Sequence, residues 1–339
     1  MFSRHRQFRS MAYAAALLVA CGMKAGIACA CAGGSVEADT PPDAGAIAAE
    51  DARAAKSILD ANLNSGFELL RIAQKSDGAR QSPNTVISPW SLQSAFGMAA
   101  IGAQNQTQVE MERFFGWPLA DRAITQGFAQ LNEQVKPSGK DGYELRTANR
   151  LWADSRVSIL PSYEQALIKG FGALTGRADF GQPAVVAGAI NQWVNESTKG
   201  LIKQLVGPSD INPEGMVLTN AVYFKGKWHS PFKKSSTRLA DFVIGSGASY
   251  RTPTMFTLSG FIYAERDGCQ IISLPYSGGA SMVIVMPMSN AGPAEAESPL
   301  DALMSKLDGQ WWTTSMKSMS FETVDFSLPK FSFQAERRL

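Results

Sequence analysis

Histidine and cysteine, which form many catalytic and metal sites, are scarce in this 339-residue chain. It contains two histidines and four cysteines. All but one of each lie within the first 31 residues, so the body of the chain holds only His229 and Cys269. A zinc site built from His and Cys ligands needs more donors than this pair provides. We therefore predict no metal and no cofactor, and we interpret His229 as a partly buried histidine at the end of a strand.

The sequence motifs of nucleophilic and phosphate chemistry are also missing. No Gly-x-Ser-x-Gly elbow is present for a serine hydrolase that would use His229 as its base. No Walker A run and no Gly-x-Gly-x-x-Gly phosphate loop occur. Nothing near Cys269 supports a role as nucleophile, and we expect it to be a small buried hydrophobic residue. The sequence therefore predicts that the chain is not an enzyme and has no catalytic residues.

The charge balance excludes an obvious polyanionic partner. The whole chain has 32 Lys and Arg against 30 Asp and Glu, a formal charge of +2. Three of the arginines lie in residues 1–20, and without that segment 29 basic residues face 30 acidic ones. Nucleic-acid-binding domains carry a clear basic excess on one face instead. We therefore expect no nucleic acid among the partners.

The first 20 residues have the pattern of an export signal. Three arginines precede a short apolar run, residues 11–20, which is too short to span a bilayer. The run ends in Leu18-Val19-Ala20-Cys21, which resembles the bacterial lipobox, in which the cysteine is acylated and becomes the first mature residue. This predicts lipidation of Cys21. The alternative is an ordinary secretory signal, cleaved at Ala28-Cys29-Ala30 or Ala30-Cys31-Ala32.

Both interpretations of the leader predict an exported protein, located outside the cell or in the cell envelope. A lipid on Cys21 would hold it at a membrane surface without spanning the membrane. Residues 21–56 are rich in Ala and Gly and contain a Pro pair, so we expect a flexible tether there. The folded domain is then predicted to cover residues 57–339.

Helical patterns precede strand patterns along this domain. Apolar residues recur on one helical face from residue 57 to 70, and Ser88 is a predicted N-cap with Pro89 at the first helical position. Residues 161–171 and 184–196 also have helical patterns. Strands are predicted over residues 142–153, 216–225, 241–244, 250–255, 261–266, 269–275 and 281–286. Because helices come first and strands follow, the pattern indicates an α+β fold.

Three local patterns lead to sharper predictions. Thr107 and Glu110 have the spacing of a capping box, which predicts that a helix begins there. Residues 216–225 are apolar on both faces, which is typical of a strand inside a sheet that is covered on both sides. Ser298-Pro299 predicts the start of a short helix that ends at Gly309.

Four segments, taken in order, resemble the serpin family, and the bacterial-type leader fits a bacterial member. They are Asn84-Thr85-Val86-Ile87-Ser88-Pro89-Trp90-Ser91, Ala148-Asn149-Arg150-Leu151-Trp152, Leu218-Thr219-Asn220-Ala221-Val222-Tyr223-Phe224-Lys225-Gly226-Lys227-Trp228 and Leu328-Pro329-Lys330-Phe331. The third segment is the most specific. The resemblance implies N-terminal helices followed by a large central mixed sheet and further sheets.

The resemblance also implies a function and a set of site residues. Serpins inhibit proteases by loop insertion: cleavage of an exposed loop lets that loop enter the central sheet as a new strand, and the trapped protease is deformed. A serine or cysteine protease is the implied partner. Ser88, Ser91 and Asn220 match positions where the sheet must part, and Trp228 matches the aromatic residue where the loop first enters. Local roles also fit, with Ser88 as an N-cap, Ser91 as a first-turn serine and Trp228 as a core anchor.

Compared with the family pattern, these 339 residues stop before the reactive loop and its reactive site. The strands that close the sheets are missing as well, which would leave unpaired backbone groups at sheet edges. We therefore expect the chain by itself to lack the part that inhibits and to fold poorly. The alternative to an inhibitor is a non-inhibitory surface binding protein, or a remnant, on a serpin scaffold.

Overall fold

The computed structural model describes residues 6–8, 44–76, 84–117, 121–137, 142–213, 215–243, 248–288 and 299–333. The predicted lipidation site Cys21 and the predicted cleavage sites lie outside these residues.

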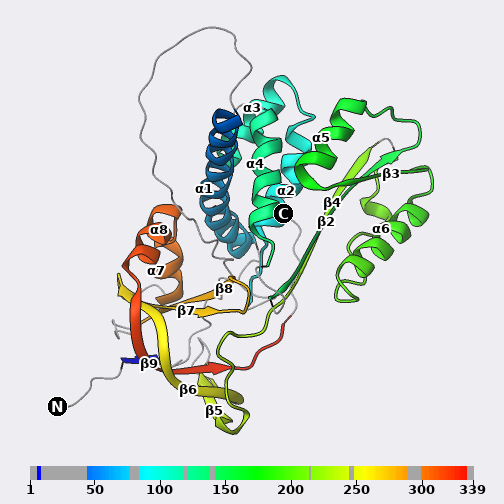
Figure 1. The fold of residues 1–339 in the computed structure, drawn as a ribbon. Coiled ribbons are helices and arrows are strands. Elements are labelled where there is room, and N and C mark those ends of the chain that lie inside the picture. The colour runs from blue at the N-terminus through cyan, green and yellow to red at the C-terminus, as the bar shows by residue number, and fades with distance from the viewer. Residues whose placement is uncertain are drawn as a thin grey trace, which may run out of the picture.

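Five helices form a bundle at one end of the molecule (Figure 1). They are α1 (Ala44–Ser76), α2 (Pro89–Ala100), α3 (Asn105–Phe115), α4 (Asp121–Gln134) and α5 (Pro161–Phe171). Their apolar faces share one core, in which Met98, Ile124 and Phe128 have no exposed surface. Gly127 lies where α4 meets α1, and a Cβ atom there would come within 3.1 Å of the backbone of Ala54. Glycine therefore permits the close approach of the two helices.

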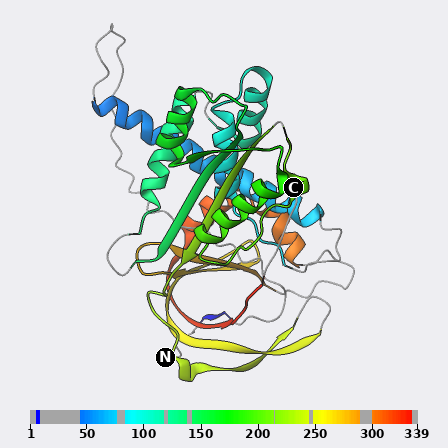
Figure 2. The ribbon, with the colours of Figure 1, turned by 90° about the vertical axis from the view of Figure 1, so that its right-hand side faces the viewer.

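A three-stranded mixed sheet lies beside this bundle in the order β3-β2-β4. Strand β2 (Glu144–Asp154) pairs in parallel with β3 (Leu174–Ala178) and antiparallel with β4 (Met216–Lys225). Leu151 and Leu218 pack into the helical bundle, whereas Trp152 and Val217 pack against α6 (Pro183–Ser197). The two long strands and the helix in front of them are visible in Figure 2. Helices therefore cover both faces of this sheet, as the two-sided apolar pattern of residues 216–225 predicts.

A six-stranded sheet forms the other end of the molecule (Figures 1 and 2). Its order is β1-β9-β6-β7-β8, and β5 pairs with β6. The strands are β1 (Arg6–Phe8), β5 (Thr237–Val243), β6 (Ser249–Arg266), β7 (Cys269–Pro275), β8 (Ser281–Pro287) and β9 (Ser320–Pro329). Only β1 pairs in parallel, with β9. Helices α7 (Pro299–Lys306) and α8 (Gly309–Ser318) pack on β7 and β8, and the short 3₁₀ turns are Pro208–Asp210 and Lys234–Ser236.

The predicted α+β class is confirmed, and several elements lie close to their predicted positions. Helix α5 and strands β4 and β7 have the predicted bounds. Ser88 is the N-cap of α2 and its side chain accepts a hydrogen bond from the Ser91 backbone N–H, with Pro89 following. Cys269 is buried, and burial raises the pKa of its thiol, so it remains a protonated core residue.

The folded domain is predicted to begin at residue 57, but helix α1 already begins at Ala44. Residues 44–56 are not a tether but the first part of α1. Ala54 and Ala55 are buried against the rest of the bundle. Alanine has the highest helix propensity of all residues, so an Ala-rich segment next to an amphipathic helix continues that helix.

Other local predictions are corrected by tertiary contacts. Helix α3 begins at Asn105 after Gln104, which makes no side-chain cap, so the predicted capping box is wrong. Gly309 starts α8 instead of ending the preceding helix, because the Asp308 carboxylate accepts a 2.6 Å hydrogen bond from the Trp311 backbone N–H. Residues 250–255 and 261–266 belong to the one continuous strand β6, since β9 pairs with it from Thr254 to Tyr263, across the gap between the two predicted strands. His229 is exposed, not partly buried.

Candidate functional site

A pair of asparagines crosses the middle of the three-stranded sheet. Asn149 and Asn220 are register partners on β2 and β4, and the Asn220 side-chain amide donates a 2.7 Å hydrogen bond to the Asn149 side-chain oxygen. Asn149 is buried, and its own amide donates a 2.8 Å hydrogen bond to the backbone carbonyl of Phe171, the last residue of α5. The side-chain oxygen of Asn220 is buried and has no hydrogen-bond partner among the described residues. Polar contacts thus tie the sheet to the helical bundle at this level, with one acceptor left over.

The two predicted serines lie together at the start of α2. Their hydroxyl oxygens are 2.8 Å apart, Ser88 is exposed and Ser91 is half-buried. Helix α2 packs against β4, the strand that carries Asn220. In the part of the chain that the structure describes, no hydrogen bond joins either serine to Asn220. The structure therefore brings the serines to each other, while Asn220 pairs with Asn149.

Trp228 follows β4 and is held in an aromatic stack. Its ring lies 4.4 Å from the ring of Tyr276 with an interplanar angle of 11°, and Phe232 meets it edge-on at 6.5 Å. The backbones of Trp228 and Tyr276 also form an antiparallel bridge. Gly226 lies below this stack, and a Cβ atom there would be 2.6 Å from the Tyr276 ring. Trp228 therefore joins the three-stranded sheet to the six-stranded sheet.

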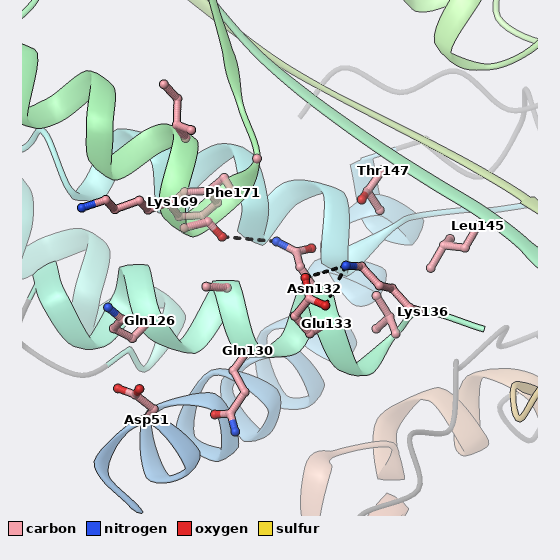
Figure 3. A pocket seen from close by; sticks show the side chains of 15 residues that line it. Asp51, Gln126, Gln130, Asn132, Glu133, Lys136, Leu145, Thr147, Lys169 and Phe171 are labelled. Carbon is pink, nitrogen blue, oxygen red and sulfur yellow. Dashed lines mark hydrogen bonds and ion pairs between the residues drawn. The ribbon is translucent and has the colours of Figure 1, made fainter. Parts of the chain in front are cut away.

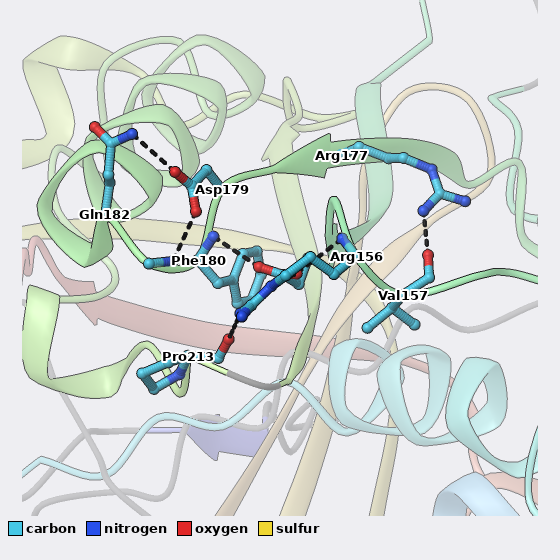
Figure 4. A network of polar contacts seen from close by, with 9 residues as sticks. Arg156, Val157, Arg177, Asp179, Phe180, Gln182 and Pro213 are labelled. Carbon is cyan, nitrogen blue, oxygen red and sulfur yellow. Dashed lines mark hydrogen bonds and ion pairs between the residues drawn. The ribbon is translucent and has the colours of Figure 1, made fainter.

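Asp154, at the opposite end of the three-stranded sheet, is the centre of a polar network whose partners Arg156, Phe180 and Pro213 are labelled in Figure 4. Its carboxylate is buried and accepts hydrogen bonds from the Arg156 side chain at 2.7 Å, the Arg156 backbone N–H at 2.9 Å and the Phe180 backbone N–H at 2.9 Å. The Arg156 side chain also donates to the carbonyl of Pro213 at 2.7 Å. Arg156 first, and then the backbone donors, lower the pKa of Asp154 to about 2. This network fastens the segment before α6 and the segment before β4 to the end of β2.

Glu144, the first residue of β2, carries the second perturbed carboxylate of this sheet. The Lys199 side chain donates a 2.8 Å hydrogen bond to it, and Arg146 donates another at 2.8 Å. These two partners lower the pKa of Glu144, Lys199 contributing most. Lys199 follows α6, so the pair holds the end of that helix near the start of β2.

Three residues that organise this region were not predicted as site residues: Asn149, Asp154 and Tyr276. Asn149 stands inside a segment that resembles the family pattern, but its link to Asn220 spans 71 positions along the chain. Tyr276 and Asp154 gave no local signal, because their partners belong to other elements. The sequence shows an Asp followed two residues later by an Arg, which is compatible with a turn. It does not show that the Asp154 carboxylate is buried.

Within the described ranges no group of three or more His, Cys, Asp and Glu side chains is placed to hold a metal ion. The same ranges contain no helix with the length and apolarity needed to cross a bilayer. The strongest features of the region are therefore structural: a sheet between two helical layers, an amide pair at its middle, an aromatic stack at one end and a buried carboxylate at the other.

Comparison of the sequence with known proteins gives a consistent result. A family model described as Serpin (serine protease inhibitor) matches residues 60–339. An uncharacterized serpin-like protein of Thermococcus kodakarensis is 34% identical over 264 residues, which cover 77% of this chain and 59% of that protein. Neuroserpin of Homo sapiens is 30% identical over 269 residues, covering 76% of this chain and 63% of that protein. The chain spans about three fifths of the length of these relatives.

Comparison of the structure with solved structures agrees. The structure titled cleaved Serpin 42Da superposes with a TM-score of 0.71 at 28% identity, covering 82% of this chain and 72% of that one. Native protease nexin-1 with heparin superposes with a TM-score of 0.71 at 27% identity, covering 82% of this chain and 74% of that one.

Proposed function

The chain belongs to the serpin family, and on that basis we propose that it forms the body of a protease inhibitor that traps a serine protease by accepting an inserted strand beside β4. Serpins are protease inhibitors and not enzymes, so membership supports the prediction that this chain is not an enzyme. Cysteine proteases are the second class of target that the proposal allows.

The observation that carries the proposal is the position of β4. Among the described residues β4 pairs with β2 alone, so no described strand occupies its other edge. An extended segment that adds to such an edge gains backbone hydrogen bonds along its whole length. The buried, unpartnered oxygen of Asn220 lies on the same strand, and an unpaired buried acceptor costs free energy. A movement of β4 that gives the Asn220 oxygen a hydrogen-bond donor would therefore recover this free energy.

The test is a protease titration with the native protein purified from its host. The protein is mixed with serine proteases that prefer basic, aromatic or small residues, and the products are separated in detergent. We expect at least one protease to give a covalent complex that survives detergent. The control uses the same protease with its active-site serine blocked, which should give no complex. Cleavage or binding without any covalent complex would contradict inhibition and favour the alternative, a binding protein on a serpin scaffold.

We further propose that the protein is exported and held at a membrane surface by acyl groups on Cys21. The support is the basic segment, the short apolar run and the lipobox-like Leu18-Val19-Ala20-Cys21. Mass spectrometry of the N-terminal peptide from the membrane fraction tests this. Acylated Cys21 as the first residue is the expected result, and Cys21→Ser should release the protein from the membrane fraction. An unmodified N-terminus after Ala30 or nearby would show ordinary secretion instead.

A further inference from the structure

A groove lies on the helical bundle and reaches Phe171 at the end of α5, whose carbonyl accepts the Asn149 hydrogen bond (Figure 3). It runs along α4 between α1, the end of α5 and the start of β2, and its volume is about 640 Å³. Pockets that hold small ligands commonly have volumes of about 300–1,000 Å³. The groove is therefore large enough for a ligand of a few linked groups.

The floor of the groove is formed by one face of α4. Gln126, Gln130 and Glu133 line it with the spacing of a single helical face. The side-chain oxygen of Gln130 is buried and has no hydrogen-bond partner among the described residues. The half-buried Gln126 amide has none there either, so a ligand in the groove can pair with it.

The two walls carry opposite charges. Asp51 on α1 and Lys169 at the end of α5 lie on either side of α4 in Figure 3, and neither makes an ion pair within the described part of the chain. The other two charges of the groove, Glu133 and Lys136, pair with each other at 2.6 Å. The lining charges of the groove therefore balance, with one acid and one base that form no ion pair with any described residue.

The shape of the groove is fixed by contacts on both sides of α4. The Asn132 side chain donates a 3.2 Å hydrogen bond to the carbonyl of Gly170, which holds the end of α5 against α4. On the other side Gly127 allows α1 to approach α4 closely near Ala54. Asp51 lies one turn before Ala54, outside residues 60–339, which match the family model. The acidic wall is thus supplied by a part of α1 that the family match does not include.

We propose that this groove binds a short zwitterionic peptide. Its ammonium group would lie against Asp51, its carboxylate would face Lys169, and a peptide group would pair with the Gln126 amide. Glutamine side chains both donate and accept hydrogen bonds, which is what a peptide backbone requires. An apolar ligand would remove Asp51 and Lys169 from water without pairing them, and a polyanion would meet Asp51 as a repulsive charge.

The test is a binding measurement by NMR titration or calorimetry on the full-length protein, with triglycine as the probe. N-acetyl-triglycine lacks the ammonium group, triglycine amide lacks the carboxylate, and maltotriose is a neutral polyol of similar length. We expect triglycine to bind saturably and both modified peptides to bind about tenfold more weakly, because each loses a charge-assisted contact. Maltotriose should not bind.

Variants locate the site and test the pairing. Asp51→Asn should weaken triglycine about tenfold but leave N-acetyl-triglycine unchanged, because the contact is already lost there. Lys169→Gln should weaken triglycine binding about tenfold but leave triglycine amide binding unchanged, because that ligand has no carboxylate to lose a contact. Glu50→Gln and Lys203→Gln change exposed charges outside the groove and serve as controls for the two variants. Absence of saturable triglycine binding, or binding that Asp51→Asn leaves unchanged, would overturn the proposal, as would equal binding of maltotriose.

Discussion

The Asn220 side chain donates a 2.7 Å hydrogen bond to the Asn149 side chain across strands β4 and β2, 71 positions apart in the sequence. The Asn149 side chain in turn donates a hydrogen bond to the Phe171 carbonyl at the end of α5. The pair therefore links the edge of the sheet to the helical bundle behind it. If β4 moves to admit a new strand, this connection is among those that must stretch or re-form.

Removal of the Asn149 side chain should destabilise the fold. In Asn149→Ala the buried Phe171 carbonyl loses its side-chain donor and the Asn220 amide loses its acceptor, and leaving such groups unpaired costs about 1–3 kcal/mol. Urea-induced unfolding measures the change in the free energy of unfolding. Gln204→Ala removes an exposed amide and is the control, with an expected change of about 0.5 kcal/mol or less. Equal effects of the two variants would show that the asparagine pair has no structural role.

The stack of Trp228 on Tyr276 predicts a graded response to substitution. Trp228→Ala loses a half-buried ring and its stacking partner, and we expect a loss of about 2 kcal/mol in the free energy of unfolding. Trp228→Phe keeps an aromatic face against Tyr276 and should cost about 1 kcal/mol or less. Urea unfolding of both variants tests this order. Similar losses for Ala and Phe would mean that the stack does not contribute as an aromatic contact.

Two glycine-to-alanine substitutions should change the stability of the protein in opposite directions. In Gly226→Ala the new Cβ atom would lie 2.6 Å from the Tyr276 ring, so the aromatic stack must shift at a cost of about 1–3 kcal/mol. Gly188→Ala, in helix α6, meets no atom within 4 Å and should stabilise the protein by about 0.5–1 kcal/mol. Melting temperatures of the two variants provide the comparison. A neutral Gly226→Ala would show that the stack is not tightly held.

The Asp154 network predicts a specific acid response. The pKa of Asp154 falls from 3.8 to about 2 in the folded protein, chiefly because of Arg156. Ionised Asp154 therefore contributes stability that is present above about pH 4 and is lost as the pH falls through about 2. Asp154→Asn should be less stable than the natural protein at pH 7, and this difference should shrink towards pH 2. A difference between the two proteins that does not change with pH would show that the charge of Asp154 is unimportant.

Much of this fold follows from local sequence patterns. Ser88 and Pro89 predict the start of α2, because a serine N-cap followed by proline at the first helical position is typical of a helix N-terminus. The α+β order and the bounds of α5, β4 and β7 also follow from periodicity. Helix α4 was not predicted, although Ile124, Phe128 and Leu131 have helical spacing and are buried. The amphipathic signal was present there, but the polar residues and Gly127 between them weakened it.

The site depends on contacts that no local pattern contains. Ser88, Ser91, Asn220 and Trp228 came from the family resemblance, and their roles in sheet opening remain predictions. Asn149, Tyr276 and Asp154 acquire their partners only when distant strands and helices meet. The predicted cover on both faces of β4 is confirmed, whereas its predicted place inside the sheet is wrong for the described residues, among which its backbone pairs on one side only.

Thermal unfolding of the native protein before and after limited cleavage by a protease shows whether the sheet accepts a strand beside β4. Insertion adds main-chain hydrogen bonds and buries apolar side chains, so we expect the cleaved protein to melt at a clearly higher temperature than the intact one. A cleaved protein that melts at the same or a lower temperature, as expected when a loop is merely nicked, would show that no strand inserts beside β4.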